Sequence, residues 1–203
     1  EKGIQHVYYH ADAALFGGYL PYYESPIKPD LNFEKHPYDS IAVSGHKFFG
    51  SPIPMGIFLI RQKHLQNIKA DYIEYIHSNN MMIPCSRSSL ITLILWWIIS
   101  TKHRDEFIKE SNEMLANTHY FYEELKRRNY PVWLNPNSNT LFFQAPSAEL
   151  SENWTLALQN CPKLGHLAHA IIMQHVDKKL INEFLQDLDK ELQLFRHSDR
   201  TTV

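Results

Sequence analysis

The sequence has little of what disulfide-linked and membrane-spanning proteins depend on. Only two of its 203 residues are cysteines, Cys85 and Cys161, and they lie too far apart to suggest a metal-binding pair. A disulfide framework is therefore not expected, and a reducing cytoplasm is the expected compartment. The longest apolar run, Leu90 to Ile99, is interrupted by Thr92 and falls far short of the ~20 residues that a membrane span needs. We expect this run to form a buried helix.

The chain also lacks an excess of charge of either sign, since 20 Lys and Arg residues face 22 Asp and Glu residues. Nucleic-acid binding needs a concentrated basic face, so it is not expected here, whereas a small anionic ligand held by a few groups is possible. The first residues contain no apolar segment of a signal peptide. An initiator Met is also missing, and the chain is already strand-like at Val7–His10, so we expect a segment upstream.

The pattern of apolar residues divides the chain into two regions. The first, from His6 to about Arg61, has short apolar runs between loops rich in Gly and Pro, and no long helix. It predicts strands at Val7–His10, Ser40–Ser44 and Met55–Ile60. The last of these is apolar throughout, which is typical of a strand that is buried on both faces.

After Gln62 the chain becomes helical. An amphipathic stripe predicts a helix from Arg104 to Arg128 that stops at Asn129, before Pro131. Further apolar patterns predict strands at 132–134, 140–144 and 167–173, a helix near 149–158, and a last helix with one apolar face. This order indicates an α+β layer, in which helices cover one face of a small sheet.

Two clusters of reactive side chains follow predicted strands. One is His10-Ala11-Asp12-Ala13-Ala14, a carboxylate among small residues, and the other is Ser44-Gly45-His46-Lys47-Phe48. Asp12 alone would be an ordinary turn or helix-cap residue, and Lys47 alone a solvated lysine. Together they suit pyridoxal 5′-phosphate (PLP), whose aldehyde needs a lysine amine and whose pyridine nitrogen needs a carboxylate. Hydroxyl and imidazole groups could bind its phosphate, and Gly45 is expected to free the backbone to turn.

The two clusters resemble the signature of the group II PLP-dependent decarboxylases, which act on aromatic amino acids, glutamate, histidine and serine. The longer stretch Asp39–Gly56 is most similar to the bacterial histidine decarboxylases and the plant serine decarboxylases. Similarity continues through Ile73–Ile76, Ser86-Arg87 and Ala168–Met173. The resemblance implies the carboxyl-terminal half of an α/β protein of the aspartate-aminotransferase type (fold type I). Residues 1–85 would belong to the PLP-binding large domain, and residues 86–203 would form a connecting helix and a small α+β domain.

The resemblance also implies roles for individual residues. Lys47 would form the Schiff base with PLP, Asp12 would pair with the pyridinium nitrogen, and Ala14 would pack against one face of the ring. Ser44 and His46 would lie close to the phosphate. The implied protein is a homodimer with its active sites at the subunit interface, and its substrate is a small amino acid. Decarboxylation of histidine to histamine and CO2 is expected, and decarboxylation of serine is the alternative.

Two departures from the family's pattern leave other functions open. Relatives usually carry Gly-Ser-Arg-Asn-Gly-His where this chain has Cys85–Leu90, a loop that the resemblance places near the phosphate and the dimer interface. The phosphate-cradling Gly/Ser loop and the ring-stacking histidine of the family would both precede Asp12. A degenerate half that serves as an interaction module is therefore one alternative. A metal-dependent hydrolase is another, because His10, Asp12 and His46 are possible ligands.

Overall fold

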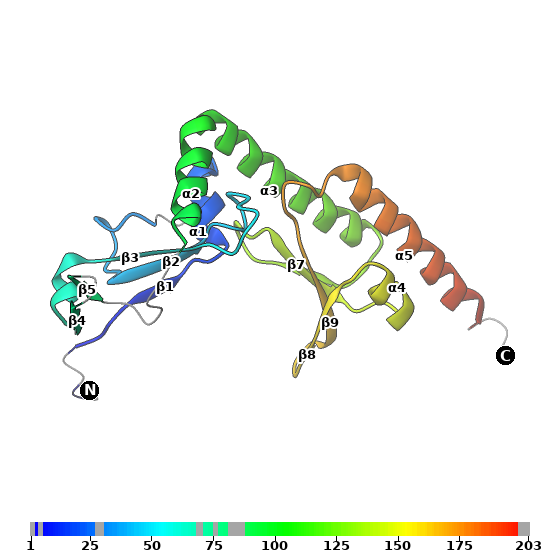
Figure 1. The fold of residues 1–203 in the computed structure, drawn as a ribbon. Helices are drawn as coiled ribbons and strands as arrows, with labels where there is room; N and C mark the ends of the chain where they lie inside the picture. Colours follow the sequence, from blue (N-terminus) through cyan, green and yellow to red (C-terminus); the bar gives the residue numbers. More distant parts are fainter. Residues whose placement is uncertain are drawn as a thin grey trace. The chain divides into compact units, whose positions relative to one another are not determined.

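The structure is a computed structural model, and it describes residues 3, 6–26, 31–67, 71–74, 77–80 and 88–198. It divides into two compact units, Glu1–Phe107 and Ile108–Val203, each with its own sheet (Figure 1). Residues 75–76 and 85–87, which belong to the predicted resemblance and to the divergent loop, lie outside the described residues. The predicted domain assignment, with its boundary after residue 85, stays a prediction. No helix in the described ranges is long and apolar enough to cross a membrane.

The first unit is built around a three-stranded sheet of order β1-β2-β3. Strand β1 (His10–Asp12) runs parallel to β2 (Ser40–Ser44), and β3 (Gly56–Ile60) runs antiparallel to β2. The strand expected at Val7–His10 begins only at His10. The reason is that the backbone N–H of Tyr9 donates to the Asp39 carboxylate at 3.0 Å instead of to a strand partner. At its other end, β1 includes Asp12 as its last residue, so Asp12 does not follow the strand as expected.

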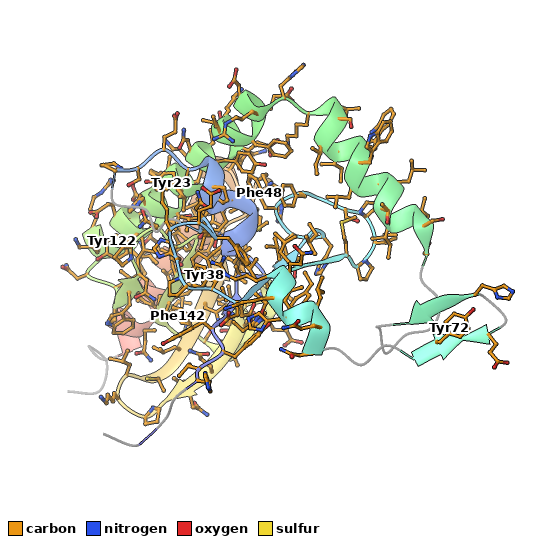
Figure 2. The ribbon with its side chains drawn as sticks, turned by 90° about the vertical axis from the view of Figure 1, so that its left-hand side faces the viewer. Tyr23, Tyr38, Phe48, Tyr72, Tyr122 and Phe142 are labelled. Atoms are coloured by element: carbon orange, nitrogen blue, oxygen red, sulfur yellow. The ribbon has the colours of Figure 1, made fainter. Side chains whose placement is uncertain are left out.

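A short helix packs on one face of this sheet. Helix α1 (Phe16–Tyr19) is followed by a 3-10 turn, η1 (Leu20–Tyr22). A Cβ on Gly17 would lie 2.5 Å from Val43 Cγ2, and one on Gly18 would lie 2.8 Å from the Cβ of Phe48. Figure 2 shows Phe48 beside this helix. The two glycines thus let α1 approach β2 and the residues after it more closely than any side chain would allow.

The remaining elements of this unit follow β3 in the sequence. They are η2 (Gln62–Asn67), the antiparallel pair β4 (Asp71–Ile73) and β5 (Ser78–Asn80), and α2 (Ser89–Thr101). The predicted helix at Leu90–Ile99 is confirmed, but its burial is not, because Trp96 is 60% and Trp97 61% exposed. The expectation that β3 is buried on both faces is also wrong. Phe58 and Leu59, on opposite faces of this last strand of the sheet, are both more than half exposed.

The second unit is the predicted α+β layer. Its antiparallel sheet has the order β6-β7-β9-β8, and α3 (Arg104–Arg127) and α5 (Lys178–Ser198) supply core residues beside it (Figure 1). The strands are β6 (Val132–Leu134), β7 (Thr140–Gln144), β8 (Ala157–Cys161) and β9 (Gly165–Ile171). The core joins Phe121 and Leu125 of α3 to Phe143 of β7 and Phe184 of α5.

The ends of two helices in this unit are set by residues in the left-handed backbone region. Helix α3 stops as predicted, with Asn129 at φ 54°. The helix expected near residues 149–158 is shorter. Helix α4 (Ala148–Asn153) ends before Thr155, whose φ is 49°, and strand β8 begins at Ala157. The sequence-based interpretation therefore missed β8 and the hairpin that it makes with β9.

Candidate active site

The carboxyl ends of β1 and β2 lie side by side and carry the predicted site residues. Ala11 pairs with Ile41 and Asp12 with Ala42. The N–H of Ser44, the last residue of β2, donates at 3.0 Å to the carbonyl of Ala14, two residues beyond β1. Because side chains alternate along a strand, Asp12, Ala42 and Ser44 share one face of the sheet. The opposite face is the one that α1 approaches through Val43.

Asp12 presents an exposed carboxylate at the end of β1. Its Oδ1 accepts the backbone N–H of Ala14 at 3.2 Å, and this is its single hydrogen bond among the described residues. Such a bond to the backbone two residues ahead fixes the turn that leads into α1. It also holds the carboxylate in place while Oδ2 stays available to a ligand.

The turn that carries His46 and Lys47 is closed at both ends by backbone hydrogen bonds. The N–H of Gly45 donates to the carbonyl of Met55 at 2.9 Å, and the N–H of Ser51 donates to the carbonyl of Gly45 at 3.1 Å. Gly45 is not in the left-handed region, so the expectation that it frees the backbone to turn is wrong. The left-handed glycine is Gly50, with a φ of 74°. Gly45 is needed for a different reason, since a Cβ there would overlap the side chain of Met55.

Lys47 is exposed, whereas the next residue, Phe48, is fully buried. The ring of Phe48 packs with those of Tyr22 and Phe107, each with a centroid distance of 6.1 Å. Among the residues that the structure describes, the Lys47 ammonium makes no hydrogen bond or ion pair. The turn is thus anchored by Phe48 and leaves the lysine amine free to react with a ligand.

The buried carboxylate of Asp39, which the sequence-based analysis did not single out, anchors the chain directly before β2. Asp39 accepts hydrogen bonds from the backbone N–H of Tyr9 at 3.0 Å, from His64 Nε2 at 2.6 Å and from Lys63 Nζ at 2.9 Å. These donors, the Tyr9 N–H first, hold the pKa of Asp39 well below its usual range. Nearby, Arg61 donates to the carbonyl oxygens of Tyr38 at 2.6 Å, of His36 at 2.9 Å and of Phe33. Both side chains stabilise the strand on which the predicted site depends.

The metal-site alternative finds no support. His10 bonds through Nδ1 to the hydroxyl of Ser40 at 2.7 Å. Nowhere in the described part of the chain do three His, Cys, Asp or Glu side chains gather closely enough to hold a metal ion, and His10, Asp12 and His46 are among the residues searched.

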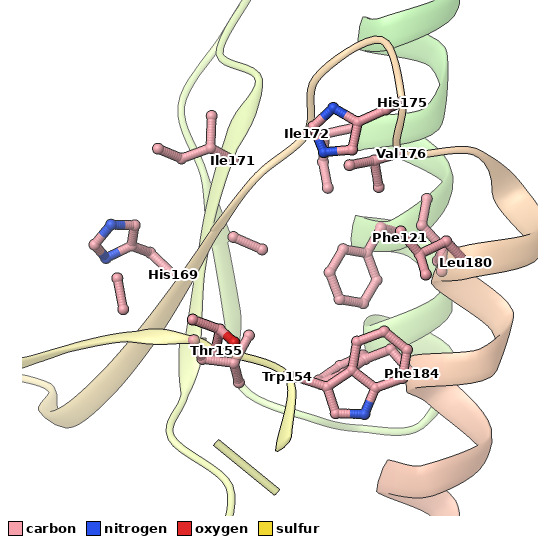
Figure 3. Close-up of a pocket in the computed structure, with 14 residues that line it drawn as sticks. Phe121, Trp154, Thr155, His169, Ile171, Ile172, His175, Val176, Leu180 and Phe184 are labelled. Atoms are coloured by element: carbon pink, nitrogen blue, oxygen red, sulfur yellow. The ribbon is translucent and has the colours of Figure 1, made fainter. Parts of the chain in front are cut away.

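A pocket of about 390 Å³ lies in the second unit, among residues that were not predicted to have a function. Figure 3 shows the rings of Phe121, Trp154 and Phe184 gathered along it, with His169 on β9. The Trp154 indole is held by a 3.2 Å bond to Asp187. None of the predicted site residues lines this pocket, and its described lining contains neither a lysine nor a carboxylate. It therefore does not offer the groups that PLP needs.

No family model matches the chain, but individual proteins do. It is 33% identical over 185 residues to serine decarboxylase 1 of Oryza sativa subsp. japonica, a match that covers 91% of this chain and 36% of the rice protein. It is 34% identical over 189 residues to a histidine decarboxylase of Vibrio campbellii, covering 91% of this chain and 47% of that protein. The chain thus spans less than half the length of these relatives.

Solved structures show the same fold at lower identity. An L-methionine decarboxylase from Streptomyces sp. 590 superimposes with a TM-score of 0.74 and 24% identity, covering 90% of this chain and 42% of that one. A sphingosine-1-phosphate lyase of Burkholderia pseudomallei gives a TM-score of 0.77 at 16% identity, covering 96% and 47%. The predicted fold class is thereby confirmed. The chain is a homologue of the serine and histidine decarboxylases, and it has the fold of the group II decarboxylases of fold type I.

Proposed function

We propose that this chain supplies the reactive lysine, Lys47, and the pyridine-binding carboxylate, Asp12, of a PLP-dependent amino-acid decarboxylase. One observation carries the proposal: Asp12 ends β1 and Lys47 lies in the turn that follows β2, at the carboxyl ends of adjacent parallel strands, the usual location of ligand sites in α/β sheets. The homology to named decarboxylases supports the same reaction class, that of the carboxy-lyases.

The residues at this edge of the sheet fit PLP. Asp12 has an exposed carboxylate held by Ala14, Ala14 itself is small and half-buried, and Lys47 has an unpaired amine among the described residues. Ser44 and His46 offer a hydroxyl and an imidazole for the phosphate. When bound, PLP supplies an electron sink for the negative charge that remains at Cα as CO2 leaves.

The chain's own side chains would act on protons and charge. The Asp12 carboxylate would keep the pyridine nitrogen protonated, so that the ring stays electron-poor. The Lys47 amine would act as the nucleophile toward the cofactor's aldehyde once it has lost a proton. Ala14 would limit the tilt of the ring, and Ser44 and His46 would fix its phosphate end. Together these residues bind and orient a cofactor on a rigid strand edge.

The proposed substrate is histidine, which would be converted to histamine and CO2. Histidine and serine decarboxylases match this chain at 33–34% identity, so identity does not separate them. Histidine is put first only on the overall resemblance of the sequence to the bacterial enzymes. Serine is the second candidate. We further propose a cytoplasmic homodimer with active sites at the subunit interface.

Borohydride reduction tests the proposal. The full-length protein, incubated with PLP and reduced, should carry the cofactor on the peptide that contains Lys47. Lys47→Arg should carry none, because a guanidinium stays protonated, and Lys63→Arg should be labelled normally. Release of CO2 from carboxyl-labelled histidine should exceed release from serine. Labelling at another lysine would overturn the assignment of Lys47, and no labelling at all would favour the interaction-module alternative.

A further inference from the structure

The ring of His46 sits against the backbone of Met55. Its Nδ1 lies 3.1 Å from the Met55 nitrogen and also 3.1 Å from the Met55 carbonyl oxygen. The carbonyl already accepts the Gly45 N–H at 2.9 Å. The Met55 N–H, by contrast, has no other hydrogen bond among the described residues, and Met55 is only 2% exposed.

The hydrogen-bond donors and acceptors around His46 decide which of its two ring nitrogens carries the proton. A buried backbone N–H without an acceptor costs roughly 1–3 kcal/mol. If Nδ1 carried the proton, the Met55 N–H would be such an orphan, and two donors would converge on the Met55 carbonyl. If Nδ1 is the acceptor, both backbone groups of Met55 are satisfied, and the ring proton must lie on Nε2.

We propose that Met55 is a positioning residue for His46: its backbone N–H fixes Nδ1 as an acceptor and so makes Nε2–H an outward-facing donor. His46 is exposed and lies in the same turn as the Lys47 ammonium. An outward N–H donor suits an anion, and the proposed function identifies that anion as the phosphate of PLP. The positioning by Met55 follows from the hydrogen bonds alone, and only the identity of the ligand rests on the proposed function.

The packing around this bond keeps the turn rigid. The Met55 side chain occupies the space beside Gly45, where an added Cβ would lie 2.9 Å from Met55 Cγ. The buried Ser51 joins its N–H to the Gly45 carbonyl at 3.1 Å and its hydroxyl to the Ile53 carbonyl at 2.8 Å. Hydrogen bonds within residues 45–55 therefore hold the loop that carries His46, and the orientation of the His46 ring is set before any ligand binds.

Nitrogen-15 NMR of the ring gives the first test and needs no cofactor. The full-length protein is labelled on histidine, and the signals of His46 are identified by their loss in His46→Asn. We expect a protonated Nε2 and an unprotonated Nδ1. A proton on Nδ1 would overturn the inference whether or not borohydride labels Lys47, so the two proposals fail separately.

Two substitutions of His46 test the role of Nδ1 separately from the role of Nε2. In His46→Asn the amide oxygen can take the place of Nδ1 and accept the Met55 N–H, but no donor reaches outward. In His46→Gln the amide nitrogen can replace Nε2–H, but the bond to Met55 is lost. We expect the Asn variant to keep the parent's melting temperature and to bind inorganic phosphate and PLP about tenfold more weakly, the effect of one lost charge-assisted bond.

The Gln variant should show the opposite pattern, with a lower melting temperature and better retained binding. His64→Asn is the matched control, since His64 bonds to Asp39 and should not affect phosphate binding. Equal melting temperatures for the Asn and Gln variants would refute the positioning by Met55. Phosphate binding that is unchanged in the Asn variant would refute the outward donor.

Discussion

Gly45→Ala should damage the turn that carries Lys47, although it adds only a methyl group. The new Cβ would overlap Met55 Sδ, and it would lie 2.9 Å from Cγ and 3.3 Å from Cβ of the same side chain. Sδ can swing away by a change of rotamer, but Cβ is fixed to the backbone, so Met55 must shift as a whole. Overpacking of this kind costs roughly 1–3 kcal/mol.

Part of that cost is offset because alanine restricts the unfolded chain more than glycine does, by roughly 0.4–1 kcal/mol. The net loss in the free energy of unfolding should therefore be about 1–2 kcal/mol. Gly56→Ala is the matched control, because a Cβ at Gly56 meets nothing within 4 Å and its φ is not left-handed. This variant should be as stable as the parent or slightly more stable.

Urea unfolding of the full-length variants measures the difference, with the midpoint and slope recorded together. A shift of Met55 also moves the N–H that donates to His46 Nδ1, so Gly45→Ala should change the ring nitrogen signals and weaken phosphate binding. Equal midpoints for Gly45→Ala and Gly56→Ala would refute the reasoning, because they would show that the space beside Gly45 is not needed.

Three further predictions follow from the structure. Asp12→Asn should still bind PLP but lose turnover by orders of magnitude, since charge matters most in the transition state; near-normal turnover measured as CO2 release would make the carboxylate structural. The depressed pKa of Asp39 gives stability that is complete above its usual value of 3.8 and is lost as the pH falls below it. Asp39→Asn should therefore flatten the acid limb of a pH–stability curve, and an unchanged limb would contradict the ion cluster. Thr155→Gly should add up to ~1 kcal/mol to the free energy of unfolding and so raise the melting temperature, because glycine adopts the left-handed backbone conformation of Thr155 without strain. A lower melting temperature would show that other contacts of Thr155 outweigh this strain.

Local patterns predicted the elements whose signals are local. The helix at α3 follows from its apolar stripe and from Asn129 and Pro131, and β2 follows from its apolar run. Strand β8 was not predicted because Ala157–Cys161 has neither β-branched residues nor a regular alternation of apolar and polar residues. The start of β1 depends on Asp39, a residue 30 positions away from Tyr9 that captures its N–H. The periodicity of apolar residues cannot predict a hydrogen bond between residues so far apart in the sequence.

Burial was harder to predict than secondary structure, because apolar composition does not say what will cover an element. Trp96 and Trp97 point about 100° apart on a helix, so their burial requires cover on two sides. In the described part of the first unit both are about 60% exposed, as is Phe58 of β3. Large apolar side chains left exposed in this way suit contact with other protein when they gather into a patch. The proposed homodimer would supply such contact.

The candidate site shows the same division between local and distant causes. The strand-end position of Asp12 and Lys47 could be predicted, because an apolar run followed by small and polar residues is a local signal. What holds Lys47 outward could not, since it depends on Phe48 packing with Tyr22 and Phe107 and on the narrow space over Gly18. The anchoring residue and the reactive residue are neighbours with opposite exposure. If the proposed roles hold, a long lysine side chain on an anchored turn could reach the cofactor without moving the sheet edge that presents Asp12, so that Lys47 would react while Asp12 kept the ring in place.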